Sequence, residues 1–237
     1  MQPTKKATEM TQRELAAYID HAILKPDFTE QDIRRYTEEA VAFGCKTVCV
    51  NPAALPLVQE LVAGTQTGLC CVCDFPFGQS TPESKAAQAA EYAKRFDLVE
   101  LDMVANYGKL IDGDLAYVTE DIRGVVEACH AEGVAVKVII ESDALTLEQV
   151  AAGTRCAADA GADFIKSSTG FYTGGESHGA TVDVVRTMIE ASEGRIKVKG
   201  SGVIRTQDHF FELIDMGMDR AGVGCTSTAK LLAGRPE

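Results

Sequence analysis

The chain of 237 residues is 46% hydrophobic and 24% charged, and its formal net charge is −12 at pH 7. This composition excludes a disordered or fibrous protein, and it can supply one large hydrophobic core or two small ones. The negative charge opposes binding to nucleic acid or to anionic lipid, so the expected partner is a small molecule.

No segment indicates export or insertion into a membrane. The N-terminal stretch MQPTKKATEMTQRELAAY has no apolar run after its lysines. No later segment approaches the roughly 18 consecutive apolar residues of a membrane span. The sequence therefore predicts a soluble, cytoplasmic protein with a short N-terminal extension at about residues 1–12.

The eight cysteines do not form the pattern of a disulfide scaffold or a zinc site. Several lie inside strand-like runs such as VCV and CCVC, where cysteine acts as a small apolar residue. No pair of CxxC motifs and no Cys/His cluster occurs. We therefore expect reduced thiols, no metal site and no cofactor.

Taken in chain order, short strand-like runs alternate with helix-like stretches, which is typical of βα units and a parallel sheet. The predicted strands cover residues 19–24, 47–51, 69–74, 98–103, 135–140, 163–166, 196–199 and 221–224. Eight units in a chain of this length fit a (β/α)8 TIM barrel better than a doubly wound open sheet. Since no linker or change in composition divides the chain, residues 1–237 are expected to form a single domain.

Charged residues alternate with apolar residues in four neighbouring strands, the fourth to the seventh. Alternate residues of a barrel strand face the surrounding helices, and the others face the interior. The apolar residues of LVELDM, VAVKVII and IKVK face the helices, which leaves the following side chains directed inward: Glu100, Asp102, Lys137, Lys197 and Lys199. Lys166 ends the sixth strand and is expected to join them. Such interiors are normally apolar, so this much charge implies pairing, a function or both.

We expect these groups to lie in two tiers. The lower tier is a structural ion cluster of Glu100, Lys137 and Lys197. The upper tier lies at the C-terminal mouth, where barrel enzymes carry their active sites, and consists of Asp102, Lys166 and Lys199. Two adjacent ammonium groups repel each other, so Lys199 favours a neutral, nucleophilic amine on Lys166, while Asp102 can move protons. The alternative interpretation is that all of these groups form structural salt bridges at the strand ends.

Glycine-rich segments follow the last three strands. STG comes after Lys166, GSG begins after Lys199, and GVG ends the eighth strand. They would place backbone N–H groups where barrels often bind phosphate, although glycines also serve turns. The candidate ligand-binding residues from these segments are Thr169, Gly170, Gly202, Gly222 and Gly224.

The chain resembles the deoxyribose-phosphate aldolase family, class I aldolases with a (β/α)8 fold. The similar blocks, which run over nearly the whole chain, are DHAILKPD, VCVNP, FPFG, ELDMVAN, KVIIE, ADFIKSSTGF and KGSGVIRT. The resemblance implies that Lys166 forms the Schiff base, Asp102 relays protons and Lys199 tunes the nucleophile. It also implies that Asp20 contacts a substrate hydroxyl; a strand-end hydrogen bond is the alternative.

The reaction implied by the resemblance is the reversible cleavage of 2-deoxy-D-ribose 5-phosphate to glyceraldehyde 3-phosphate and acetaldehyde. An iminium on Lys166 would accept the electrons of the broken bond and become an enamine, without a metal. Such a lyase serves carbohydrate degradation and deoxyribonucleotide catabolism. Barrels of this family are often homodimers, so a homodimer is the expected assembly.

The chain departs from the family pattern where the substrate is expected. Ala22 replaces a threonine, Val203 replaces the second glycine of SGGIR, and residues 176–179 form an insertion. VGCTST replaces a serine-rich segment, and the printed sequence ends at LLAGRPE without the tyrosine that many relatives carry there. Val203, itself a candidate ligand-binding residue, restricts the backbone and adds bulk beside a bound phosphate. Two alternatives therefore remain: an aldolase for a different or unphosphorylated sugar, and a non-catalytic sugar-phosphate-binding barrel.

Four further residues have a functional and a structural interpretation. Cys49 could meet an aldehyde, but a packed thiol is the favoured interpretation. Glu141 could face the mouth or the solvent. His178, in the insertion, is expected to be exposed, and Arg205 is expected to form an ion pair on the helix after the seventh strand rather than to bind phosphate.

Overall fold

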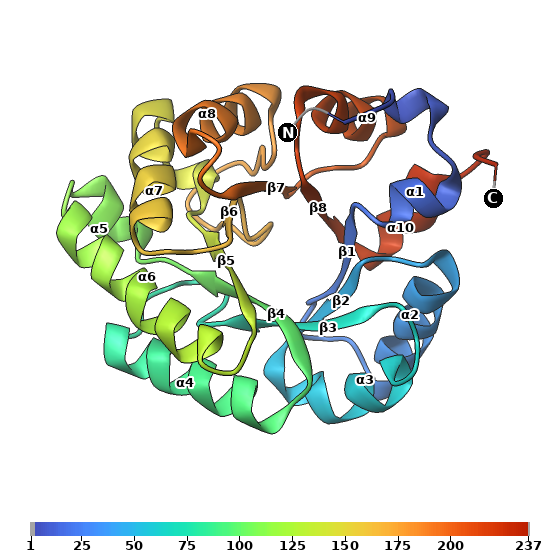
Figure 1. Ribbon diagram of the computed structural model, residues 1–237, viewed down its shortest axis with the longest axis horizontal. Coiled ribbons are helices and arrows are strands. Elements are labelled where there is room, and N and C mark those ends of the chain that lie inside the picture. Colours follow the sequence, from blue (N-terminus) through green and yellow to red (C-terminus); the bar gives the residue numbers. More distant parts are fainter. Residues whose placement is uncertain (1–2, 237) are drawn as a thin grey trace.

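A computed structural model, which describes residues 3–236, has eight parallel strands joined in chain order into a closed barrel (Figure 1). The strands are β1 (Ile19–Ile23), β2 (Thr47–Val50), β3 (Gly68–Cys73), β4 (Leu98–Val104), β5 (Ala135–Ile139), β6 (Phe164–Lys166), β7 (Lys197–Ser201) and β8 (Arg220–Gly224). The predicted TIM barrel is confirmed, and each strand end lies within two residues of its predicted position.

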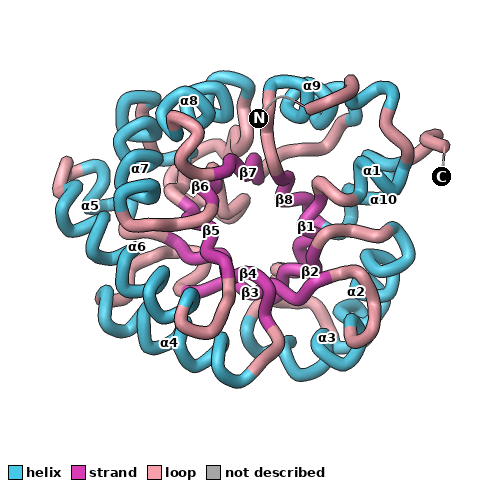
Figure 2. The backbone as a smooth tube through the Cα atoms, viewed as in Figure 1, coloured by secondary structure: helices cyan, strands magenta, loops and turns pink. Residues whose placement is uncertain are grey.

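Helices surround the barrel as an outer ring, and loops connect them to the strands (Figure 2). The helices are α1 (Gln12–Ala16), α2 (Glu30–Phe43), α3 (Leu55–Val62), α4 (Pro82–Arg95), α5 (Tyr107–Ile111), α6 (Leu115–His130), α7 (Leu147–Asp159), α8 (Val182–Ser192), α9 (Gln207–Met216) and α10 (Cys225–Leu232). Short 3-10 helices cover Ala7–Glu9 (η1), Pro52–Ala54 (η2) and Ser142–Ala144 (η3). Capping boxes begin α1, α2 and α7, where a threonine side chain binds a free N–H group of the first turn.

The main hydrophobic core lies between the strands and the helices. A second, smaller apolar cluster consists of Leu24, Cys49, Cys70 and Val72, of which Cys49 and Cys70 lie beside Asp102. The outward-facing residues of β4 and β5, such as Leu101 and Val136, belong to the main core, as the alternation predicts. All eight cysteines are buried as free thiols, which confirms the expectation from the sequence.

The segment before β1 packs beside the C-terminal part of the chain (Figure 1). The N–H of Ala7 donates to Asp215 of α9 at 2.8 Å, and the N–H of Gln12 donates to the carbonyl of Pro236 at 2.6 Å. None of the helices within residues 3–236 is both long and apolar enough to cross a membrane.

Candidate active site

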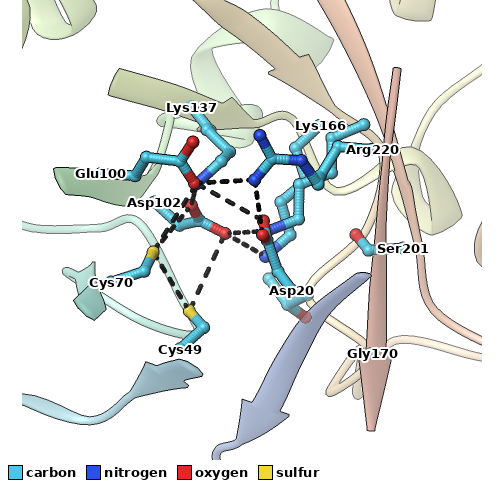
Figure 3. A network of polar contacts seen from close by, with 12 residues as sticks. Asp20, Cys49, Cys70, Glu100, Asp102, Lys137, Lys166, Gly170, Ser201 and Arg220 are labelled. Carbon is cyan, nitrogen blue, oxygen red and sulfur yellow. Dashed lines mark hydrogen bonds and ion pairs between the residues drawn. The ribbon is translucent and has the colours of Figure 1, made fainter. Parts of the chain in front are cut away.

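A network of charged side chains fills the middle of the barrel (Figure 3). Its members are Asp20, Glu100, Asp102, Lys137, Lys166, Lys199 and Arg220, all of which are buried. Asp102 of β4 lies at the centre. Its Oδ2 accepts hydrogen bonds from Lys166 at 2.8 Å and Lys199 at 2.7 Å, and its Oδ1 accepts one from Lys137 at 2.9 Å. The upper tier predicted from the sequence is therefore assembled around one carboxylate.

The lower part of the network differs from the prediction in one member. Lys137 Nζ lies 2.5 Å from Glu100 Oε2, as expected. Lys197, however, is exposed and forms no ion pair with the described residues. Arg220 takes its place and donates from Nη1 to Glu100 at 3.0 Å and to Asp20 at 2.6 Å. The predicted eighth strand began one residue late, which excluded Arg220 from the inward-facing set.

Asp20 belongs to this charged network and does not line the cavity at the carboxyl ends of the strands. Its Oδ2 lies 2.6 Å from Lys199 Nζ, and its Oδ1 accepts from Thr47 at 2.7 Å as well as from Arg220. Asp20 is fully buried beneath the cavity described below and does not line it. The structure favours the alternative, a structural role of Asp20 within the network, because neighbouring cations and Thr47 contact its carboxylate. Contact with a substrate hydroxyl stays a prediction.

The network contains one more cationic side chain than carboxylates. It has four cationic side chains against the three carboxylates of Asp20, Glu100 and Asp102. Buried charge is costly unless it is paired, so loss of one proton from a lysine brings the network to neutrality. Arg220 cannot supply that proton, because a guanidinium remains ionised in proteins.

The three lysines differ in the number of carboxylates that hold them. Lys137 lies within 3.5 Å of three carboxylates and Lys199 within 2.7 Å of two. Lys166 contacts Asp102 alone. Each carboxylate attracts a neighbouring ammonium group, so Lys166 is the lysine that the carboxylates of the network hold least.

The other central groups remain charged. Burial alone would lower the pKa of Lys199, but Asp102 and Asp20 outweigh burial and raise this pKa above its ordinary value. Burial would raise the pKa of Asp102, yet the three neighbouring lysines outweigh it and hold this pKa well below its usual range. Lys166 thus lies beside a fixed cation and a fixed anion.

A cavity of about 240 Å³ opens at the carboxyl ends of the strands. Lys166 is the one member of the charged network that lines it within residues 3–236, since Asp102 and Lys199 lie behind Lys166. All six ligand-binding candidates other than Asp20 line this cavity: Thr169, Gly170, Gly202, Val203, Gly222 and Gly224. The structure therefore brings the predicted glycine-rich segments to the predicted lysine.

Gly222 has a packing role that only glycine can fill. A Cβ added at this position would lie 2.8 Å from the Cβ of Ser201 and 3.2 Å from the Cε of Lys199. The absence of a side chain at Gly222 therefore leaves room for Lys199 to extend across β8 to Asp102 and Asp20.

Comparison with known proteins agrees with this geometry. The family model described as "DeoC/LacD family aldolase" matches residues 15–234. The chain belongs to this family. It is 43% identical to a deoxyribose-phosphate aldolase from Dictyoglomus turgidum over 90% of this chain and 94% of that protein. It is 42% identical to one from Kocuria rhizophila, over 92% of this chain and 95% of that protein.

Solved structures of aldolases are also similar to this chain. A deoxyribose phosphate aldolase from Aeropyrum pernix, described as tetrameric, superposes with a TM-score of 0.83 and 28% identity. The alignment covers 94% of this chain and 91% of that one. An aldolase named QR15 superposes with the same TM-score and 32% identity, over 92% of this chain and 94% of that chain.

The N–H groups of the turn after Lys166 form hydrogen bonds within the structure. Gly170 donates to Ser168 Oγ at 3.0 Å, and Phe171 donates to Thr169 Oγ1 at 2.9 Å. The N–H of Thr169 points to Glu141 Oε1 at 3.4 Å. Thr169 and Gly170 therefore shape the cavity wall, and free N–H groups must come from elsewhere.

Free N–H groups occur on the opposite wall. Within residues 3–236, the structure gives no hydrogen bond for the N–H groups of Val203 and Ile204. Helix α10 begins at the same wall with Cys225, Thr226 and Ser227, and no side chain caps it. These unpaired donors and the positive end of the helix dipole form a site suited to an anion.

The mouth of the cavity is cationic in a protein of net charge −12. Lys25 and Arg205 line the cavity with Lys166, and no Asp or Glu is among its lining residues within 3–236.

Arg205 forms no ion pair with a described residue, so its predicted ion pair is wrong. Sequence reasoning missed Lys25, whose position five residues after Asp20 offered no pattern that separates it from a solvent-exposed lysine.

Two carboxylates after β5 hold the turn that follows Lys166. Glu141 is buried, with a left-handed φ of 54°, and accepts from Ser168 Oγ at 2.8 Å and from Thr169 Oγ1. Burial raises the pKa of Glu141. Asp143, which sequence reasoning missed, accepts from the N–H groups of His178 and Gly179 at 2.8 and 2.7 Å. Its Oδ2 also lies 2.8 Å from Ser168 Oγ, whose single proton it shares with Glu141. The side chain of His178 is exposed, as predicted.

Cys49 and Cys70 lie beside Asp102, yet this group does not suit a metal ion. The two sulfur atoms are 3.5 Å apart, and Cys70 Sγ lies 3.4 Å from Asp102 Oδ1. The three residues could in geometry surround an ion. Lysine ammonium groups already occupy both oxygens of Asp102 and would repel another cation. Cys49 does not line the cavity, so the structure favours a packed thiol over contact with an aldehyde.

Proposed function

We propose that the protein is a class I aldolase that reversibly cleaves 2-deoxy-D-ribose 5-phosphate to glyceraldehyde 3-phosphate and acetaldehyde. The observation that carries the proposal is the position of Lys166. It is the network amine that reaches the cavity, and it has the fewest carboxylate partners. An amine that lines the cavity and is held by a single carboxylate is the group placed to attack a carbonyl compound.

The reaction begins at Nζ of Lys166, whose lone pair attacks the aldehyde carbon of the open-chain sugar. The carbinolamine oxygen takes up a proton and leaves as water, which gives an iminium. Removal of the proton from the C3 hydroxyl then breaks the C2–C3 bond, and its electron pair moves into the iminium to form an enamine. Protonation of the enamine carbon and hydrolysis release acetaldehyde and the free lysine.

Asp102 and Lys199 supply the proton path. Asp102 accepts hydrogen bonds from both lysines on the same oxygen, so a proton can pass between them through this carboxylate. Because Asp102 and Lys199 both lie behind Lys166, an intervening water would carry protons between this pair and the substrate. Lys199, held as a cation, disfavours a second charge on Lys166 and stabilises negative charge that develops on oxygen.

The walls of the cavity favour a phosphorylated substrate. Lys25 and Arg205 contribute positive charge, and no carboxylate among the described residues lines the cavity to oppose them. The free N–H groups of Val203 and Ile204, with the start of α10, would bind the phosphate oxygens.

A different or unphosphorylated sugar is the second candidate, and Val203 is the observation that favours it. The side chain of Val203 adds bulk to the wall that would hold the phosphate. Rates of acetaldehyde release from 2-deoxyribose 5-phosphate and from free 2-deoxyribose separate the two candidates. A preference for the free sugar, or turnover of neither alongside cleavage of another sugar phosphate, would reject the first.

The Schiff base is tested by borohydride reduction with acetaldehyde, followed by mass spectrometry of peptides. The wild-type protein should gain one reduced ethyl group on Lys166, and Lys166→Leu should gain none. Lys94→Leu, which alters an exposed lysine on α4, is the matched control and should label as the wild type does. An unlabelled wild-type protein that still binds the sugar phosphate would favour the non-catalytic barrel.

The assembly and location of the protein remain predictions. A homodimer was expected by resemblance, whereas the similar protein from Aeropyrum pernix is described as a tetramer. We infer a homo-oligomer of unspecified size, which light scattering after size-exclusion chromatography would measure. Fractionation of cells would test the proposed cytoplasmic location.

A further inference from the structure

A second cavity, of about 880 Å³, lies at the opposite end of the barrel. Its wall includes Lys46, Ala135, Asp163 and Arg220, which lie just before or at the amino ends of β2, β5, β6 and β8. This end of a (β/α)8 barrel normally serves stability rather than binding. The side chains around this lower cavity indicate a further role.

Arg220 presents unused hydrogen-bond donors to the lower cavity. The residue is only 7% exposed, and its Nη1 donates to Asp20 and Glu100. For Nε and Nη2 the structure gives no hydrogen bond within residues 3–236. A guanidinium carries five N–H donors in a planar fork, and its free edge matches the two oxygens of a carboxylate or phosphate. Arg220 is therefore a buried cation whose Nη1 donates to two carboxylates, while its Nε and Nη2 are free to bind a ligand.

Two lysines add positive charge that no carboxylate among the described residues neutralises. Lys46 and Lys197 line the same cavity, are exposed and form no ion pair within residues 3–236. Lys197 Nζ and the guanidinium carbon of Arg220 lie 5.3 and 5.4 Å from the ring centre of Phe164. Both groups therefore meet at one aromatic ring in the cavity wall.

The carboxylates of the lower cavity already have partners. Glu100 is held by Lys137 and Arg220. Asp163 accepts from the N–H of Val136 at 2.8 Å and lies 2.8 Å from His130 Nε2. Asp219 accepts from the N–H of Val198 at 2.9 Å. Arg195, the fourth lining cation, is paired with Asp159. The lining groups left without a carboxylate partner or with free donors are Lys46, Lys197 and the second edge of Arg220, and an anion is the ligand that would satisfy them.

We propose that the lower cavity binds a small oxyanion with at least two negative charges, held by the free edge of Arg220 and by Lys197 and Lys46. Dicarboxylates and phosphate monoesters share this chemistry. A paired contact to Arg220 fixes the orientation of one oxyanion group, and the flexible lysines neutralise the remaining charge.

The site is connected to the catalytic network by direct contacts. Arg220 binds Asp20, Asp20 contacts Lys199, and Lys199 shares Asp102 with Lys166. A bound anion adds negative charge to a buried network that also contains Glu100 and Lys137. Added negative charge stabilises the fully protonated form of the whole network, in which Lys166 and Lys199 share Asp102. The acidic limb of the pH–rate profile should therefore move to higher pH; this part rests on the proposed function.

Binding is tested by isothermal titration calorimetry with malonate and, separately, with inorganic phosphate. The wild type and the control Lys94→Ala should bind at least one anion, and Lys46→Ala/Lys197→Ala should bind it at least tenfold more weakly. Preference for malonate or for phosphate distinguishes the two sources of the ligand. Phosphate can also bind in the cavity lined by Lys166, and the double variant should retain this share of the phosphate binding. Absence of binding to the wild type, or equal binding of both anions to the double variant, overturns the proposal.

Coupling is tested by pH profiles of kcat/KM with and without the bound anion. The double variant carries changes at two exposed lysines outside the catalytic network and should keep its basal activity within about twofold. The anion should shift the acidic limb upward by about half a pH unit in the wild type and not in the double variant. An unchanged wild-type profile despite measured binding overturns the coupling alone, whereas loss of aldol cleavage without any anion overturns the proposed function.

Discussion

Val203 adopts a backbone conformation that valine normally avoids. Its φ is +58°, in the left-handed region, and its side chain is 36% exposed, so packing does not compensate for the strain. A β-branched residue in this region costs about 1–3 kcal/mol. The same residue contributes a free N–H group to the proposed phosphate wall. The strained backbone therefore lies in the turn proposed to bind phosphate, at the position where Val203 replaces the glycine of the family pattern.

Replacing Val203 with glycine should stabilise the protein. Relief of strain outweighs the greater backbone entropy of glycine in the unfolded chain, so the free energy of unfolding should rise by about 1 kcal/mol. Urea denaturation measures it. Val99→Gly is the matched control, because Val99 is also exposed but lies in β4, where glycine should lower stability. Equal losses in both variants would contradict the strain argument.

His21 of β1 should make stability depend on pH. Its Nδ1 lies 2.9 Å from Thr228 Oγ1, and burial lowers its pKa from 6.5 to about 4. Between these two values the unfolded chain binds a proton that the folded protein does not, so stability falls as the pH drops. From pH 7.5 to pH 5 the loss attributable to His21 is about 2 kcal/mol.

The variant His21→Asn isolates this contribution, because its amide can replace the Nδ1 contact but does not titrate. Urea unfolding at both pH values should show a loss for the wild type that exceeds the loss for the variant by about 2 kcal/mol. Equal pH dependence of the two proteins would show that His21 is not the titrating group.

At the scale of elements, η3 joins three segments that are distant in sequence. Asp143 of η3 binds Ser168, which follows β6, and the N–H groups of His178 and Gly179 before α8. The N–H of Ala180 then donates to the carbonyl of Gly202 at 3.1 Å, after β7. One carboxylate therefore holds the segment that the sequence marked as an insertion against the proposed phosphate turn.

Asp143→Ala should raise KM for 2-deoxyribose 5-phosphate about threefold to tenfold while kcat changes less. Two hydrogen bonds from backbone N–H groups and the contact with Ser168 are lost, but none of them reaches Lys166. Asp143→Asn keeps an acceptor and should recover part of the loss. Glu176→Ala, an exposed change in the same segment, should behave as the wild type. A fall in kcat with KM unchanged would place Asp143 in the chemistry instead.

The elements themselves followed closely from the sequence, whereas the partners of the side chains did so only in part. Alternation in β4 to β7 correctly directed Asp102, Lys137 and Lys199 inward, because the period of a strand is fixed by its geometry. It did not exclude Lys197 from the ion cluster, because Lys197 is the first residue of β7 and lines the cavity at the amino ends of the strands, where it pairs with no carboxylate of the described residues. Asp143 was missed because its contacts join residues 25 to 36 positions apart, and no local pattern records them.

For the whole molecule, the buried network is a single electrostatic unit. Removing the cation of Lys199 leaves three cationic groups against three carboxylates, so the network is then neutral without the loss of a proton. Lys199→Leu should therefore move the acidic limb of the kcat/KM profile to higher pH by at least about one unit. This direction agrees with the repulsion expected from the sequence. A profile identical to the wild type would reject it.

A second change tests whether charge balance is the cause. In Lys199→Leu/Asp20→Asn, one cation and one carboxylate are removed, and the excess of one cation returns. The acidic limb should move back toward its wild-type position, even though the protein carries two substitutions in its core. Further displacement of the limb would show that the local contact between Lys199 and Lys166, rather than the balance of the network, controls the amine.

Gly222 sets a limit on how this barrel can be altered for other aldehydes. Because the stem of Lys199 passes over the bare backbone there, any side chain installed at 222 would displace the amine that Lys166 depends on. Libraries aimed at a wider acceptor range should leave this position constant and vary Ala22 and Val203, which line the same cavity without supporting the lysine.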